Sequence, residues 1–229
     1  MNTSAVSLIA LPVAYNAIFG VLAARFDYPD ILRRPTDEIL ERFQAGGPAL
    51  IRWWEAFMLT ALAFVAVPVL LVGQLEGADP DLLLLSAVVG ALAGLVQALG
   101  LLRWGFVVPH LARRHAAAVA AGDRADAAAQ KAIFEALHRY LGVGVGEHLG
   151  YLLTGVWTVL ASAAVVQSNA LADWIGWAGL LPGLALVLGS REFAGRHEEH
   201  GWAPAEKLVP VAYVAWSLWL VALGIGLLV

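Results

Sequence analysis

The sequence predicts an all-α, polytopic membrane protein built as a six-transmembrane-helix bundle. Two observations predict this class. Apolar residues make up 60% of the 229 residues and charged residues only 14%, whereas soluble domains average about 45–50% and about 25%. A helix needs about 20 mostly apolar residues to cross a bilayer, and six stretches of the sequence reach or nearly reach this length. They cover approximately residues 5–24, 53–73, 82–102, 146–167, 174–189 and 208–229, in a single transmembrane domain of residues 1–229.

The positive charges predict the orientation of these six spans. All 14 Lys and Arg residues lie in or beside the linkers that follow spans one, three and five, and the other two linkers contain none. Because cytoplasmic loops are enriched in Lys and Arg, the three charged linkers are expected inside and both termini outside. The alternation also supports the count of six, since one span more or fewer would break it.

The linkers inside are expected to form short amphipathic helices. Thr36 precedes two acidic residues and three apolar ones, with Gly46 as an end signal. Asp123 is placed to cap a second helix, whose apolar residues between 133 and 141 share one face. The third span can continue past Arg103 to His115, with a kink at Pro109.

Charged and imidazole side chains lie toward the inner ends of four spans. Such groups are costly in hydrocarbon, so they need protein or water around them. The candidate ligand-binding residues are Arg52, Glu55, Arg103, His110, Glu147, His148, Tyr151, Arg191 and Glu192.

Span four carries the most informative pattern. Gly142, Gly146 and Gly150 recur every four residues, as in helices that pack closely in membranes. At about 100° per residue, Glu147, Tyr151, Thr154 and Thr158 share one face. This polar stripe is expected to face protein or water. Possible partners on other spans are Tyr15, Asn16, Thr60, Gln97, Tyr213 and Ser217.

Two interpretations of the polar groups remain open. In the first they are structural, as Arg–Glu pairs and interhelical hydrogen bonds. In the second they line a pocket facing the cytoplasm, in which the guanidiniums of Arg52, Arg103 and Arg191 hold a small polar or anionic ligand. The second describes a non-enzymatic sensor, accessory subunit or small transporter.

Two rival functions remain. One is an intramembrane enzyme that uses Glu147 and His148 in acid–base chemistry, which requires both side chains in one pocket. The other is a purely structural subunit of a membrane complex. Beyond the lipid bilayer, a membrane protein partner or a second copy of the chain is a possible partner.

Other patterns carry little functional weight. The absence of cysteine excludes disulfides and thiolate chemistry, and a net charge of −4 without a basic patch does not suggest nucleic-acid binding. Metal or haem ligation, for example by His110 and His148, is not favoured, and the identity of any cofactor stays open. Residues 197–200 lack the spacing of a zinc-protease helix, and residues 142–146 lack that of a phosphate loop.

The tryptophans and one short repeat complete the picture. Six Trp lie near predicted span ends, where interfacial anchors occur, and Trp157, Trp216 and Trp219 lie deeper. The six are Trp53, Trp54, Trp104, Trp174, Trp177 and Trp202. Pro-Val-Ala-Tyr occurs at 12–15 and again at 210–213, which is expected in so apolar a chain and is interpreted as coincidence.

Three motifs carry a resemblance to a known family. They are Arg-Trp-Trp-Glu-Ala-Phe at 52–57, Gly-Glu-His-Leu-Gly-Tyr-Leu-Leu-Thr-Gly at 146–155, and Lys-Leu-Val-Pro-Val-Ala-Tyr at 207–213 followed by Trp-Ser-Leu-Trp at 216–219. With them the chain resembles, over its whole length, a family of compact bacterial membrane proteins catalogued as a domain of unknown function. The resemblance implies a helical bundle and a multi-pass location in the bacterial inner (plasma) membrane. It implies no activity, substrate or catalytic residue.

Overall fold

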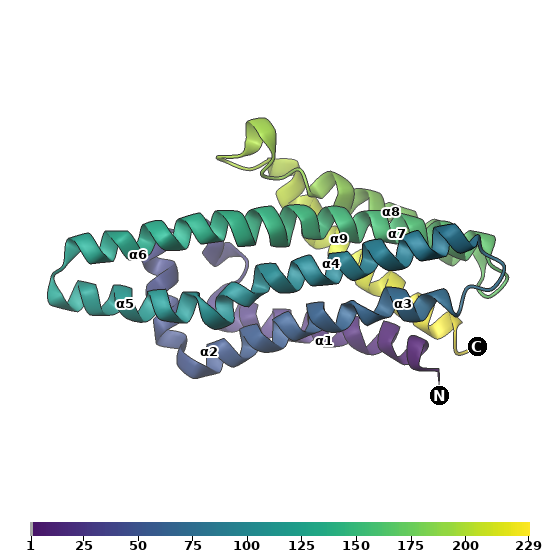
Figure 1. The fold of residues 1–229 in the computed structure, drawn as a ribbon, viewed down its shortest axis with the longest axis horizontal. Coiled ribbons are helices and arrows are strands. Elements are labelled where there is room, and N and C mark those ends of the chain that lie inside the picture. Colours follow the sequence, from purple (N-terminus) through teal and green to yellow (C-terminus); the bar gives the residue numbers. More distant parts are fainter. Residues whose placement is uncertain (1) are drawn as a thin grey trace.

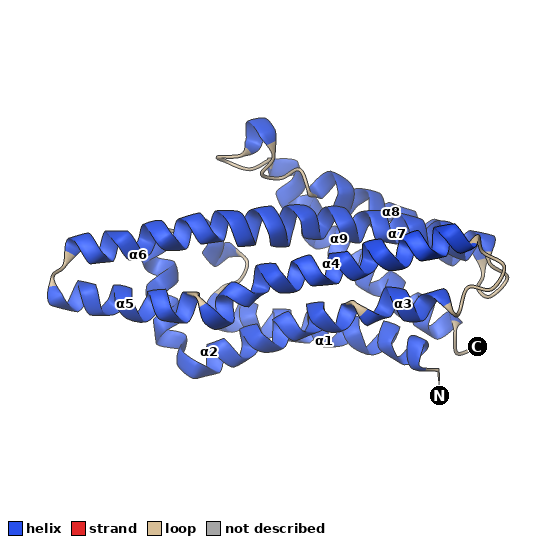
Figure 2. Cartoon of the chain, viewed as in Figure 1, coloured by secondary structure: helices blue, strands red, loops and turns tan. Residues whose placement is uncertain are grey.

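The computed structural model describes residues 2–229, and in this part of the chain every regular element is a helix (Figure 2). Helices joined end to end form six rods that lie side by side over much of their length (Figure 1). The rods are α1 (Thr3–Phe26); α2 and α3 (Thr36–Phe64 and Ala66–Val72); α4 and α5 (Pro80–Phe106 and Val108–Ala121); α6, the π-helix η2 and α7 (Arg124–Leu137, His138–Leu149 and Gly150–Gln167); α8 (Asp173–Gly189); and α9 (Ala203–Gly226). Two 3₁₀ turns, η1 (Asp30–Arg33) and η3 (Gly195–His197), lie in linkers.

Five of the described helical segments are long and apolar enough to cross a membrane: Thr3–Phe26, Thr36–Val72, Pro80–Ala121, Arg124–Gln167 and Ala203–Gly226. The sixth, α8, is apolar but has only 17 residues. Large apolar side chains such as Leu84, Leu181 and Leu218 face outward, whereas Thr154, Thr158 and Ser162 are fully buried. A bilayer favours this distribution, because polar groups there must find partners inside the protein.

The termini and the two linkers without Lys or Arg lie at one end of the bundle, hereafter the terminal end. The side-chain amide of Asn2 donates to the carbonyl of Leu227 at 3.4 Å, and the amide of Asn169 donates to the carbonyl of Glu76 at 3.2 Å. Ion pairs connect the three cationic linkers at the other end, the linker end (Figure 1). The alternation seen in the sequence is therefore a separation of charge between two ends of one bundle.

The two amphipathic segments differ from the prediction in how they join the spans. The first begins at Thr36 and turns at Gly47, whose φ of 55° and ψ of −155° interrupt the helix before Pro48. Thr36 is not its cap, and its hydroxyl donates to Glu135 instead. The second is capped by Asp123 as expected, but it is not a separate helix. It continues through η2 into α7, so the glycines between 142 and 146 lie within one continuous helical segment.

Two of the predicted interfacial tryptophans are inside the protein. Trp54 and Trp104 are both fully buried and stack with ring centroids 4.4 Å apart. The ring of Phe26 meets that of Trp54 edge-on, and the ring of Phe43 stacks on that of Trp104. Phe43 reaches Trp104 because the part of α2 before Gly47 folds across this end of the bundle. The prediction was therefore wrong for Trp54 and Trp104, whereas Trp174 and Trp177 are indeed exposed, at 62% and 60%.

Candidate functional site

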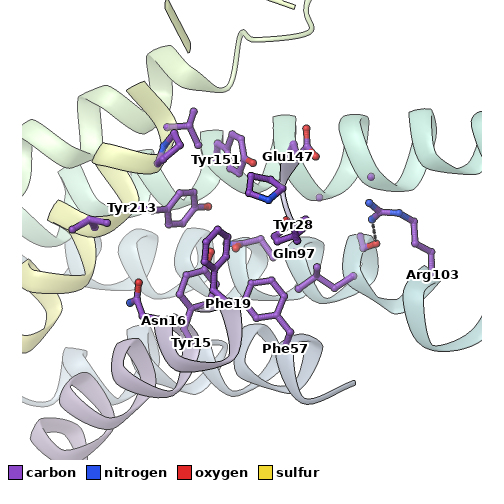
Figure 3. Close-up of a pocket in the computed structure, with 18 residues that line it drawn as sticks. Tyr15, Asn16, Phe19, Tyr28, Phe57, Gln97, Arg103, Glu147, Tyr151 and Tyr213 are labelled. Carbon is purple, nitrogen blue, oxygen red and sulfur yellow. Dashed lines mark hydrogen bonds between the residues drawn. The ribbon is translucent and has the colours of Figure 1, made fainter. Parts of the chain in front are cut away.

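A cavity of about 200 Å³ lies between α1, α2, α4, η2, α7 and α9, on the linker side of the bundle. Its wall is dominated by aromatic rings, four of which belong to tyrosines (Figure 3). The aromatic lining residues are Tyr15, Phe19, Tyr28, Phe57, Tyr151 and Tyr213, and the polar or charged ones are Asn16, Gln97, Arg103 and Glu147.

Close contact between α4 and η2 sets one wall of this cavity. A Cβ atom on Gly100 would lie 2.5 Å from the Cα of Gly146, so only two glycines allow the backbones to approach this far. A Cβ on Gly150 would similarly meet the side chain of Gln97 at 2.8 Å. The four-residue glycine repeat therefore serves packing, as predicted.

Arg103 is buried in this wall, where its guanidinium contacts neutral groups. Its guanidinium donates to the carbonyl of Gly100 (Figure 3). It also lies 3.3 Å from Nδ1 of His138 and 5.1 Å from the ring centroid of Trp104. The last contact is a cation–π interaction. The Nε atom alone has no hydrogen-bond partner within the described residues.

Glu147 has no such partners. Over residues 2–229 its carboxylate forms no ion pair within 4.0 Å. It lines the main cavity and also a second one of about 120 Å³, which extends toward the linkers. The cavity of about 200 Å³ is called the aromatic chamber below, and the second cavity is called the vestibule. Glu147 lies where the two meet. The charged residues and the histidine that line the vestibule are Arg33, His138, Glu147, Glu192 and Glu206.

The vestibule is bounded by a three-residue ion-pair group. Arg33 lies 3.0 Å from Glu192 and 3.4 Å from Glu206. Burial raises the pKa of Glu192, and Arg33 opposes this rise. Burial and the nearby charge of Glu147 likewise raise the pKa of Tyr28 above its usual range, so this hydroxyl stays protonated at the junction.

The polar stripe of span four faces protein, as the sequence predicts. Tyr151 lines both cavities. Thr154 accepts a hydrogen bond from Gln97 at 2.8 Å, and Thr158 accepts one from the indole of Trp216 at 3.0 Å. Asn16 donates to Ser217 at 3.0 Å. The stripe thus begins at the cavity and ends in closed interhelical hydrogen bonds.

The nine candidate residues do not converge on one site. Arg103, Glu147 and Tyr151 line the main cavity, and Glu192 lines the vestibule. Arg52, His110 and Arg191 are exposed, Glu55 is half-buried, and none of these four lines either cavity. Of the three guanidiniums expected around an anion, the geometry brings only that of Arg103 to the chamber.

Glu147 and His148 have different neighbours. The His148 ring lies 2.6 Å from the carbonyl of Ser190, through Nδ1. The two residues share only a recess of about 10 Å³, room for about one water molecule. This geometry does not provide the shared substrate pocket that the acid–base hypothesis requires. Among the described residues, no three His, Asp or Glu side chains are grouped so that they could hold a metal ion.

Sequence reasoning missed the aromatic character of the site. Four of the five tyrosines in the chain line the main cavity, although the tyrosines at 15 and 213 were considered only as possible polar partners. The repeated Pro-Val-Ala-Tyr brings Tyr15 and Tyr213 together from α1 and α9, with ring centroids 6.1 Å apart. That repeat was the available signal, because both copies end in a tyrosine of the cavity wall.

Comparison with known proteins places the whole architecture in one family. The family model described as "Domain of unknown function (DUF4386)" matches residues 3–224. No protein of curated function and no solved structure matches the chain. The match covers the helices that form the cavity as well as those that close the terminal end, and the chain accordingly belongs to the DUF4386 family.

Proposed function

We propose that this chain is a six-span membrane protein, with both termini outside the cytoplasm, that binds a small molecule in the aromatic chamber. The binding serves sensing, an accessory role or transport rather than catalysis. One observation carries the proposal: the cavity of about 200 Å³ joins side chains from five separate rods and leaves polar groups in its wall without protein partners. Functional pockets combine an apolar wall with a few polar groups in this way.

The orientation and the sixth span rest on charge and connectivity. All positive charges lie at the linker end or beside it, which is expected to be cytoplasmic. The 17 residues of α8 extend about 25 Å at 1.5 Å per residue, slightly less than the hydrocarbon thickness. Since α8 packs between α7 and α9, we infer that it is a short sixth span in the bacterial inner membrane.

The cavity reaches the surface at the linker end, and its lining also includes Asn16 on α1 and Val214 on α9, which are exposed. The vestibule reaches the surface beside Arg33 and Glu206, which are about half-exposed. Toward the terminal end the stripe is closed at Thr154 and Thr158, both with no exposed surface. This supports a binding site that communicates with the cytoplasm. A single domain, and association with another membrane protein or a second copy, stay predictions.

Native mass spectrometry of the protein purified in mild detergent tests the proposal. We expect a reproducible mass above that of the polypeptide, corresponding to one bound molecule. Val214→Trp should remove it, because Val214 lines the cavity on α9. Val211→Trp is the matched control on the same helix. Val211 is 67% exposed and is not part of the lining.

The two variants decide the outcome together. A bare wild-type polypeptide, or a bound mass that both variants retain, would contradict the proposed function. Both replaced valines are largely exposed, at 55% and 67%, so neither larger side chain should prevent folding.

A further inference from the structure

We propose that the chamber selects a small organic cation with an apolar or aromatic body. This inference rests on the proposed function and specifies the class of ligand at the same site. It follows from three features of the wall: the contacts of Arg103, the carboxylate of Glu147, and the aromatic rings that face the space.

The guanidinium at the chamber already contacts neutral groups of the protein. Arg103 donates to the carbonyl of Gly100, approaches His138 and lies over the ring of Trp104. A Cβ atom on Gly142 would be only 2.7 Å from its terminal nitrogen, so the backbone of η2 covers it closely. An anionic ligand would have to compete with these contacts.

The carboxylate of Glu147 is not in direct contact with a cation, although the charge of Arg103 acts on it at longer range. Glu147 has no ion-pair partner within the described residues and lines both cavities. Together the two cavities are lined by three glutamates and two arginines, which is one more acidic side chain than basic ones. In the vestibule Arg33 alone faces both Glu192 and Glu206. The path to the chamber therefore favours a cation over an anion.

The aromatic rings suit the same charge. Tyr15 stacks on Phe57 with centroids 4.9 Å apart, and Tyr151 meets Tyr213 edge-on at 5.5 Å. Tyr28 and Phe19 join these rings from the linker side (Figure 3). The faces of such rings attract ammonium ions, because the face of an aromatic ring carries partial negative charge, and the rings also accommodate apolar bodies. The volume of about 200 Å³ suits a ligand smaller than a typical drug molecule.

Three probes of similar shape and different charge test the inference. They are the cation benzyltrimethylammonium, its neutral isostere neopentylbenzene, and the anion benzylsulfonate. Each is measured by equilibrium dialysis against the full chain in lipid nanodiscs, with empty nanodiscs subtracting partition into lipid. We expect saturable binding of the cation and weaker binding of the other two.

Variants connect the preference to the residues. Glu147→Gln should weaken cation binding by at least about tenfold, the effect of losing one charge-assisted contact, and leave neopentylbenzene unchanged. Glu147→Asp should retain the preference. Tyr151→Leu should weaken binding of the cation by about threefold or more, because a cation–π attraction is lost. Glu198→Gln is the control, since Glu198 lies outside both cavities and is 70% exposed.

The outcomes separate this inference from the proposed function. If the anion or the neutral isostere binds as tightly as the cation, the chamber is a binding site and the cation preference is wrong. If no probe binds the wild-type chain, the inference is wrong, whereas the native mass test still judges the function. Should Glu147→Gln fail to fold, the comparison of three probes on the wild type decides alone.

Discussion

The half of the bundle toward the terminal end and the half that contains the cavity are packed differently, although both contain many aromatic residues and glycines. In the terminal half, Trp157, Trp216 and Trp219 are buried against one another, and their neighbours are glycines that let helices approach. In the cavity half, tyrosines surround a space. Both halves are rich in aromatic residues and in glycine, so these compositions do not decide whether a region is solid or hollow.

The difference lies in how polar atoms are satisfied. In the terminal half, the indole of Trp216 donates to Thr158 at 3.0 Å and that of Trp219 donates to the carbonyl of Ile175 at 2.9 Å. In the cavity half, the hydroxyl of Tyr213 has no hydrogen-bond partner in the described residues, and Glu147 has no ion pair there. The terminal half also contains buried polar atoms without a partner in the described residues, among them the indole nitrogen of Trp157 and the hydroxyl of Ser162. In the cavity half such atoms border a volume of about 200 Å³.

The largest loss of stability is expected from a substitution in the terminal half, called the solid half below. Trp157→Ala removes a ring with no exposed surface, and substitutions of this kind cost about 3–5 kcal/mol. Tyr15→Ala, in the cavity wall, should cost clearly less because its ring already borders a space. Reversible unfolding in mixed micelles measures both. Equal losses would mean that the two halves do not differ in packing.

The next effect tests the helix contacts of the solid half. A Cβ on Gly155 would lie 2.6 Å from the carbonyl of Gly183 and 2.7 Å from the amide of Val187. Gly155→Ala should therefore destabilise the fold by about 1–3 kcal/mol, as overpacking does. Gly20→Ala is the matched control, because nothing lies within 4 Å of its Cβ position. A neutral Gly155→Ala would exclude tight contact between α7 and α8.

A smaller effect compares satisfied with unsatisfied polar groups. Thr158→Val removes the acceptor of the Trp216 indole, and interhelical hydrogen bonds in membranes average about 0.6 kcal/mol. Tyr213→Phe removes a hydroxyl without a partner and should cost less than this or increase stability. The two melting temperatures, measured without added ligand, give the result. The reverse order would show that the Tyr213 hydroxyl is bound to something.

The smallest expected effect concerns pH at the vestibule. Burial raises the pKa of Glu192 above its ordinary value of 4.5, so the folded protein holds this proton more tightly than the unfolded chain. The corresponding stability is present below pH 4.5 and declines as the pH rises through the folded pKa.

Glu192→Gln removes this titration. Melting temperatures between pH 4 and pH 8 should therefore fall more steeply with pH in the wild type than in Glu192→Gln. A steeper fall in the variant would mean that Arg33 dominates over burial and lowers the pKa.

The sequence predicts the arrangement of helices better than it predicts the site. The lengths of the apolar stretches and the alternation of Lys and Arg locate the rods and place the termini at one end. Both patterns are set by the membrane, which requires long apolar helices and collects positive charge on one side. Trp54 and Trp104 escaped prediction, because their burial depends on the turn at Gly47 folding α2 across the bundle. The cavity was predicted at Glu147 and Tyr151 from one helix face. Phe19 and Phe57 could not be found, since single apolar residues in an apolar chain carry no signal of facing a space. Tyr28 was missed because it lies in a charged linker outside the predicted spans.

The participation of both α1 and α9 in the chamber has a consequence for how the protein is made. Asn16 and Ser217 are hydrogen-bonded across 201 residues of sequence, and Tyr15 meets Tyr213 beside them. During synthesis the earlier helices can enter the membrane and pack, but the chamber lacks a wall until α9 is inserted. A molecule that binds there would therefore bind only chains in which α9 has been inserted, and it would stabilise only those.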